Sequence, residues 1–281
     1  MAVGKKITDL TASGSLKDTD LAIVHDGNGT KRSTLTQLSE YMGTKFSNPN
    51  LLINPDFKIN QRGKTSYTIS GFEYTVDRWR ISGCTVSVSD NGLTIQNVDS
   101  SGSWISQKFE KELKGVFTLS VKVSSISGKV HLTNSDNSVI ITSAGIHSTT
   151  LSGLSEFNMF VETGSSVTFE WAKLEKGSIA TPFVAPNPTE ELMKCQRYYA
   201  KTVGELRAYS NAGTSFGVTA NLPTTMRTKP TININNIYSY NVSSINTEIK
   251  NDNSAIFVYG TAKNQDSTVV YCVVMCDAEI Y

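Results

Sequence analysis

The sequence has almost no net charge and no long apolar run. Lysine and arginine total 26 against 25 aspartate and glutamate residues, so the formal net charge is +1. This balance provides no global field that would collect nucleic acid or an anionic membrane surface. The opening residues MAVGKKITDL have lysines but no apolar segment after them, and no window approaches 18 uninterrupted apolar residues. We therefore expect neither a signal peptide nor a membrane span, and synthesis in a cytoplasm.

The cysteine and histidine spacing of a metal site is also missing. There are four cysteines, three histidines and no CxxC pair. Cys84 and Cys195 stand alone, while Cys272 and Cys276 lie in the run TVVYCVVMCDAEI. In a strand that rises about 3.3 Å per residue, the Cα atoms of this last pair would be roughly 13 Å apart, beyond disulfide reach. We expect four reduced, mostly buried thiols, with no metal and no cofactor.

Enzyme signatures are absent as well. The chain has no GxSxG, HExxH, P-loop or glycine-rich dinucleotide fingerprint. A glycosidase needs two carboxylates held close together, and nothing in the sequence pairs any two of the available acids: Asp56, Asp77, Glu110 and Glu175. Asp77 with Arg78, just before Trp79, is more typical of a buried or half-buried ion pair at a strand edge. We predict no catalysis, with a surface-glycan depolymerase as the alternative.

The residues that are plentiful favour strands and turns. Hydrophobic residues make up 38% and charged residues 18%, and Ser, Thr, Asn and Gly are abundant. A length of 281 residues suits two domains with a small appendage. We predict an all-β protein in four parts: an N-terminal anchor segment (1–46), a jelly-roll β-sandwich (47–186), a short linker helix (187–202) and a C-terminal β-domain (203–281).

The first 46 residues predict a small hairpin followed by one helix. The stretch LAIVHDGNGTKRSTL has a turn at 26–29 between two short extended runs. Thr34 and Gln37 then form a T-x-x-Q capping box. The helix is too short to be stable alone, so we expect docking on a partner to order it. Three residues on one helical stripe are the predicted anchor contacts: Leu35, Leu38 and Met42.

Alternating apolar residues in the next segment predict a β-sandwich. The run VTFEW puts Val167, Phe169 and Trp171 on one face, and VFTLSVKV does the same between 117 and 123. The DNG triplet at 90–92 supplies a tight turn between two alternating runs. Several short strands broken by turns are typical of a jelly roll.

Aromatic residues in this segment are the candidates for binding. An exposed ring with Asn, Asp or Gln nearby can hold a sugar through its apolar face and its hydroxyl groups. The predicted glycan-binding residues are Tyr67, Tyr74 and Trp104. Trp79 and Trp171 lie in runs with apolar neighbours, so we expect both in the core.

Three prolines between 182 and 188 mark a linker before a second helix. Thr189 is the predicted N-cap of this helix, and its apolar stripe consists of Leu192, Cys195 and Tyr199. After about residue 203 the pattern returns to strands, including AIFVYG. We read this last part as a second β-domain.

The order of several motifs resembles tail-fibre proteins of tailed phages and prophages. In a module common in these proteins, an N-x-F segment and an LE-x-G segment flank a jelly roll similar to carbohydrate-binding modules. The matching stretches here are NLLINPDFKINQRG (50–63), VDRW (76–79), AKLEKGSIATPF (172–183) and EELMKCQRYYAKT (190–202). LPTTMRTKPTI (222–232) looks like a strand of tail-fibre tips, and residues 6–42 resemble the segment by which many phage appendages join their particle.

This resemblance implies a virion protein made in the host cytoplasm, a tail-fibre, head-fibre or spike subunit with a receptor-binding role. Its expected partners are further copies of itself in a homotrimer, other phage structural proteins at the N-terminus, and host cell-surface glycan. The resemblance supplies no binding residue, and it leaves open attachment to tail, collar or head and direct host contact or an adaptor role. A bacterial carbohydrate-binding module would share the jelly roll but normally carries an export signal.

Overall fold

The computed structural model describes residues 15–25, 27–43, 45–97, 101–133, 139–250 and 252–281. The chain divides into two compact units, residues 1–48 with 179–184, and residues 49–178 with 185–281. The described residues form sixteen strands and only two short helices, which confirms the all-β prediction. No helix in these ranges is long and apolar enough to cross a membrane.

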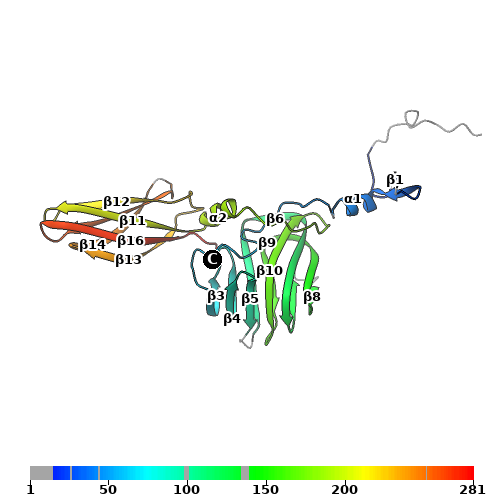
Figure 1. The fold of residues 1–281 in the computed structure, drawn as a ribbon, viewed down its shortest axis with the longest axis horizontal. Helices are drawn as coiled ribbons and strands as arrows, with labels where there is room; N and C mark the ends of the chain where they lie inside the picture. Colours follow the sequence, from blue (N-terminus) through cyan, green and yellow to red (C-terminus); the bar gives the residue numbers. More distant parts are fainter. Residues whose placement is uncertain (1–14, 26, 44, 98–100, 134–138, 251) are drawn as a thin grey trace, which may run out of the picture. The chain divides into compact units, whose positions relative to one another are not determined.

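The first unit contains the predicted hairpin and helix. Strands β1 (Leu21–His25) and β2 (Thr30–Thr34) pair antiparallel and lead into helix α1 (Leu35–Gly43) (Figure 1). The capping box is reciprocal, because the Thr34 N–H donates to Gln37 Oε1 at 3.0 Å and the Gln37 N–H donates to Thr34 Oγ1 at 3.1 Å. Residues 1–14 of the predicted anchor and Asp26 of its turn lie outside the described residues.

Eight strands of the second unit form the predicted jelly roll. They are β3 (Ser66–Tyr74), β4 (Arg80–Ser89), β5 (Gly92–Asn97), β6 (Ser103–Ser127), β7 (Val130–Thr133), β8 (Val139–Ile141), β9 (Gly145–Val161) and β10 (Ser166–Lys176). The hydrogen-bonded order is β3-β4-β5-β10-β6-β9-β7-β8, with an additional β4–β6 pairing. The long strands β6 and β9 lie side by side (Figure 1), and their register shifts between residues 108 and 116 of β6.

That shift lets β6 belong to two groups of strands. Its first residues pair with the start of β4 and the end of β9, whereas residues 117–127 pair with β10. The two groups enclose one apolar core. Trp79 is fully buried there, with its ring centroid 4.8 Å from that of Phe57 and 5.7 Å from that of Phe157, so its predicted core position is confirmed.

A β-bulge overturns one face assignment. Strand β10 shifts register between Phe169 and Trp171, so the buried positions after the bulge are Ala172 and Leu174. Val167 and Phe169 are buried as predicted, but Trp171 is only half-buried. The prediction that Trp171 shares their face and lies in the core is therefore wrong, because one extra residue in a strand moves every later side chain to the opposite face.

The N-cap of the second helix lies two residues earlier than its sequence indicated. Helix α2 (Pro188–Gln196) has Asn187 as its N-cap, whose side-chain oxygen accepts from the N–H groups of Thr189 at 2.9 Å and Glu190 at 3.3 Å. Proline suits the first helical turn because the missing N–H has no partner there anyway. The prediction that Tyr199 lies on this helix is wrong. Tyr199 opens strand β11 (Tyr199–Ser210), so the C-terminal strands begin before residue 203.

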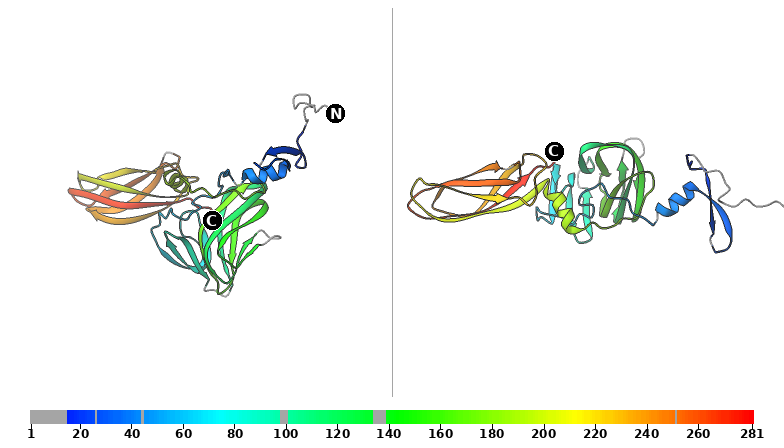
Figure 2. Two further views of the ribbon diagram at one scale, coloured as in Figure 1. Left: turned by 45° about the vertical axis from the view of Figure 1, so that its right-hand side comes forward. Right: turned by 90° about the horizontal axis from the view of Figure 1, so that it is seen from above.

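The C-terminal strands, yellow to red in Figure 2, form two three-stranded sheets. One has the order β11-β16-β13, with β16 (Asp266–Asp277) and β13 (Thr231–Tyr240); the other has the order β12-β15-β14, with β12 (Ser215–Asn221), β15 (Ala255–Ala262) and β14 (Val242–Lys250). A second apolar cluster lies between them. All four cysteines are free and buried, as predicted, and Cys272 and Cys276 belong to this cluster.

Candidate functional site

A row of aromatic and apolar side chains crosses the outward face of the jelly roll. Trp104 of β6 pairs with Phe160 of β9, Phe160 pairs with His131 of β7, and His131 pairs with Ile140 of β8. Side chains of directly opposed residues lie on the same face of a sheet. On the other side of Trp104, its backbone N–H donates to Ser82 Oγ of β4 at 3.3 Å.

The row continues from β4 to β3. Ser82 pairs with Phe72, whose ring is 45% exposed. We call Phe72, Trp104, Phe160, His131 and Ile140 the outward aromatic row. It spans both edges of this group of strands, from β3 to β8.

Strand alternation explains why these side chains point away from the core. Their chain neighbours Ile105, Met159 and Leu132 are fully buried, so the alternate positions must face outward. Trp104 is 38% exposed and Ile140 is 54% exposed, while Phe160 and His131 are half-buried.

The middle of the row is a packed aromatic group. The ring centroids of Trp104 and Phe160 lie 4.9 Å apart, and those of Phe160 and His131 lie 5.9 Å apart, both within the range of favourable aromatic pairs. The Phe160 ring occupies space over Gly102, where an added Cβ would come within 2.2 Å of the ring. Gly102 also has a φ of +81°, which favours glycine. The glycine therefore leaves room for the Phe160 ring, which is tilted by 51° against that of Trp104.

Charged groups lie at the Phe72 end of the row and beside His131. The Arg80 guanidinium lies 4.0 Å from the Phe72 ring centroid, and its Nη1 lies 3.8 Å from Glu156 Oε1. Further along the row, His131 Nε2 lies 2.6 Å from Glu162 Oε1, and Lys129 Nζ lies 3.9 Å from Glu162 Oε2. The hydrogen bond from His131 holds the pKa of Glu162 below its usual value.

This arrangement suits a flat ligand that has both an apolar face and hydroxyl groups. The rings provide apolar contact area, while the carboxylate and guanidinium groups beside Phe72 and His131 can accept and donate hydrogen bonds. A pyranose ring has these properties.

Of the three predicted glycan-binding residues, Trp104 alone lies in this row. Tyr67 and Tyr74 are 7% and 6% exposed, and their hydroxyls donate to the carbonyl oxygens of Thr75 at 3.1 Å and Ile280 at 2.7 Å. Burial raises the pKa of each tyrosine to about 12. The expectation of an exposed ring is wrong for both, because the residues that cover them come from elsewhere in the chain.

Sequence reasoning missed Phe72, Phe160 and His131. Phe160 and His131 each stand next to a strand position whose burial could be read from alternation, as in FNMFV, where Phe157 and Met159 are buried and Phe160 faces outward; Phe72 follows a register shift in β3 and has exposed neighbours. The alternation therefore contained the orientation of Phe160. The cross-strand partners of these residues were not readable, because they depend on strands far apart in the sequence.

The four acids considered for hydrolysis each lie beside a different basic residue. Asp56 lies 3.5 Å from Lys58, Glu175 lies 3.2 Å from Lys173, Glu110 lies 3.1 Å from Arg197 and Asp77 lies 3.4 Å from Arg62. These ion pairs explain the acids as structural groups. Among the residues that the structure describes, no cluster of His, Cys, Asp or Glu could hold a metal ion.

Asp77 and Arg78 are both buried, as predicted, but they do not pair with each other. Asp77 Oδ2 accepts from Gln61 Nε2 at 2.7 Å, and burial raises the pKa of Asp77 to about 6. Arg78 forms its ion pair with Glu279, and its guanidinium lies 3.7 Å from the Tyr198 ring centroid. The predicted pair is replaced by two pairs with residues that are distant in the chain.

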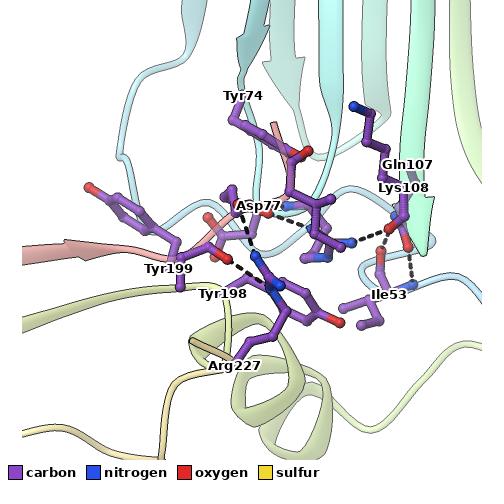
Figure 3. A network of polar contacts seen from close by, with 12 residues as sticks. Ile53, Tyr74, Asp77, Gln107, Lys108, Tyr198, Tyr199 and Arg227 are labelled. Carbon is purple, nitrogen blue, oxygen red and sulfur yellow. Dashed lines mark hydrogen bonds and ion pairs between the residues drawn. The ribbon is translucent and has the colours of Figure 1, made fainter. Parts of the chain in front are cut away.

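These groups belong to a polar network that joins the jelly roll to the C-terminal strands (Figure 3). Arg62 lies 4.0 Å from the Tyr199 ring centroid and 3.6 Å from Glu279 Oε1. Arg227 donates to the carbonyl oxygens of Ala278 at 3.0 Å and Glu279 at 3.2 Å. Most of the network is buried and bonded within itself, although Arg62 Nη2 and Arg78 Nε are buried without a hydrogen-bond partner.

The predicted anchor contacts are accessible in the first unit. Helix α1 has no buried residue; Leu35 is half-buried, and Leu38 and Met42 are 36% and 46% exposed. Tyr41 and Phe46 add further exposed apolar area, at 60% and 62%. The unit thus presents apolar side chains that its own fold does not cover.

Comparison with known proteins gives little similarity. No protein-family model matches the chain, and no curated protein matches it. Among solved structures, recombinant discoidin II of Dictyostelium discoideum is similar at 12% identity over 67% of this chain and 82% of that one, with a TM-score of 0.24. Wild-type discoidin II from the same organism is 11% identical over 66% of this chain and 81% of its own, with a TM-score of 0.23. Scores this low assign neither fold nor function.

Proposed function

We propose that this chain is a non-enzymatic, glycan-binding appendage subunit of a tailed phage or phage-like particle. The jelly roll holds host cell-surface glycan on the outward aromatic row. Residues 1–46 join the subunit to other structural proteins of the particle, and the subunit works as a homotrimer. Three weak glycan sites on one trimer, repeated over a particle, give firm attachment through avidity.

The observation that carries the binding proposal is the alignment of Phe72, Trp104 and Phe160 on one outward face, with charged groups at the Phe72 end of the row and beside His131. The order of the phage-like motifs and the exposed apolar residues of α1 support the appendage role.

Glycan binding is tested by titrating purified protein with host surface polysaccharide in a calorimeter. Trp104→Ala removes a partly exposed ring, and we expect the affinity to fall about 5- to 30-fold, equivalent to about 1–2 kcal/mol. Tyr259→Ala is the matched control, because Tyr259 is exposed to a similar degree, at 37%, on a C-terminal strand. Unchanged binding by Trp104→Ala, or release of reducing ends by the wild-type protein, would contradict the proposal.

The attachment role is tested separately in particles that lack this gene. Complementation with a chain that lacks residues 1–46 should leave the protein out of purified particles, while the full-length chain should be incorporated. A point variant gives a sharper comparison: Leu38→Asp should impair incorporation, whereas Glu40→Asp on the same helix should not. Normal incorporation of the truncated chain would show that the anchor lies elsewhere.

A further inference from the structure

The central strand of one C-terminal sheet is apolar on both faces. In β16, alternate residues from Thr268 to Cys276 are buried in the core between the two sheets. The residues between them face outward and are only half-buried: Val269, Tyr271, Val273 and Met275. An antiparallel sheet with one face in water usually alternates apolar and polar residues, and a continuous apolar run is typical of a strand covered on both sides.

The flanking strands widen this apolar area. Val203 of β11 pairs with Val273 and is 48% exposed. On the other side, Tyr238 and Tyr240 of β13 pair with Tyr271 and Val269, and they are 55% and 47% exposed. Together with the outward residues of β16, these side chains form what we call the β16 face.

The other C-terminal sheet differs. Its central strand β15 also has two outward aromatic rings, Phe257 and Tyr259, but polar residues flank them. Thr219 and Glu248 lie opposite Phe257, and Asn246 lies opposite Tyr259. The apolar area therefore lies on one side of this sandwich, as expected when one sheet faces a partner and the other faces water.

The charges around the β16 face indicate what covers it. Lys201, Glu205 and Arg207 pair with its central strand, which begins at Asp266 and ends at Asp277, so two cations lie beside three anions. Arg207 Nε lies 3.3 Å from Glu205 Oε1. A face with an apolar centre and one net negative charge around it does not suit nucleic acid, an anionic membrane or a strongly charged peptide. It suits another apolar face.

The two rims of the face are complementary to each other. The β11 rim has Lys201, Glu205 and Arg207, whereas outward residues of the β13 rim, such as Asn233 and Tyr238, are uncharged. When the β13 rim of one copy meets the β11 rim of the next, cations approach tyrosine rings and no like charges are opposed. Repeated head-to-tail contacts of this kind form a ring when the rotation between successive copies closes.

We propose that the β16 face is the surface on which a second copy of this chain docks, in a cyclic homo-oligomer. This inference rests on the homotrimer of the proposed function and names its surface. A three-stranded face about eight residues long measures roughly 26 Å by 14 Å, or about 370 Å² in projection. This area is well below the roughly 800 Å² per partner of a standard stable interface, so association is concentration-dependent.

The test is the mass of the full-length protein by light scattering at about 1 to 200 µM. We expect a shift from the chain mass of 30.6 kDa towards three times that value as the concentration rises. Tyr271→Lys, which puts a charge in the middle of the β16 face, should remain monomeric throughout. Tyr259→Lys, at the corresponding central strand of the other sheet, should associate like the wild type.

Cross-linking decides the matter even if Tyr271→Lys fails to fold. The four native thiols are buried, so a cysteine added at the surface is the reactive one. Tyr238→Cys should give covalent multimers with a short bismaleimide, whereas Tyr259→Cys should stay monomeric. Multimers from Tyr259→Cys alone, or a trimer that persists in folded Tyr271→Lys, would refute the β16 face as the docking surface but not the homotrimer itself. A monomeric wild type at 200 µM would refute both the docking surface and the homotrimer.

Discussion

The ion pair between Arg78 and Glu279 joins residues that are 201 positions apart. It lies at the joint between the jelly roll and the residues that follow β16. The Arg78 side chain is 2% exposed and the Glu279 side chain is fully buried. Glu279→Ala would leave the Arg78 guanidinium without its anion in a place that water does not reach.

The expected cost follows from this burial. Removing one partner of a buried pair destabilises a protein by about 3–5 kcal/mol, because the remaining charge stays buried and uncompensated. Arg78 keeps its hydrogen bond to the Lys108 carbonyl at 2.6 Å and its contact with the Tyr198 ring, so the lower end of that range applies. A loss of about 3 kcal/mol corresponds to a fall in Tm of about 6–12 °C.

Urea denaturation and scanning calorimetry of the full-length chain measure this loss. The matched control is Glu170→Ala, which breaks the surface pair between Glu170 and Lys122, whose side chains are 32% and 40% exposed. Surface pairs of this kind contribute about 0–1 kcal/mol, so the control should lower the Tm by less than about 4 °C.

A double variant separates the ion pair from simple loss of packing. Arg78→Met combined with Glu279→Leu removes both charges and keeps side-chain volume, so we expect it to recover most of the stability lost in Glu279→Ala. A loss below about 1 kcal/mol in Glu279→Ala would refute the reasoning. So would a double variant less stable than the single one.

Three further outcomes follow from the buried groups. Burial raises the pKa of Asp77 from 3.8 to about 6, so the folded state favours the protonated carboxyl group. The free energy of unfolding should therefore fall by about 1–3 kcal/mol as pH rises from 4 to 7. Asp77→Asn should flatten this pH dependence. The four thiols should react with Ellman's reagent only after unfolding, because all are buried. Gly102→Ala should displace the Phe160 ring and weaken glycan binding, as Trp104→Ala does. Gly63 also has a positive φ but open space around it, so Gly63→Ala should leave glycan binding unchanged.

Local sequence patterns predicted a large part of this fold. The reciprocal hydrogen bonds of Thr34 and Gln37, the turn before Gly92 and the buried alternation from Phe117 to Val123 were all readable from the sequence. Each depends on residues only a few positions apart, whose periodicity and hydrogen bonding act along one segment. The same holds for Cys272 and Cys276, which are too far apart along one strand for a disulfide.

Long-range pairing decided the rest. No local signal announces the bulge that turns Trp171 away from the core, or the distant Glu279 that pairs with Arg78 in place of Asp77. Tyr74 became buried because the far end of the chain, at Ile280, accepts its hydrogen bond. Trp104 could be proposed as a binding residue from its sequence, but its neighbours could not be. The alternation within one strand determines which side chains share a face, whereas the register between strands determines which of them meet, and that register forms only in the folded chain.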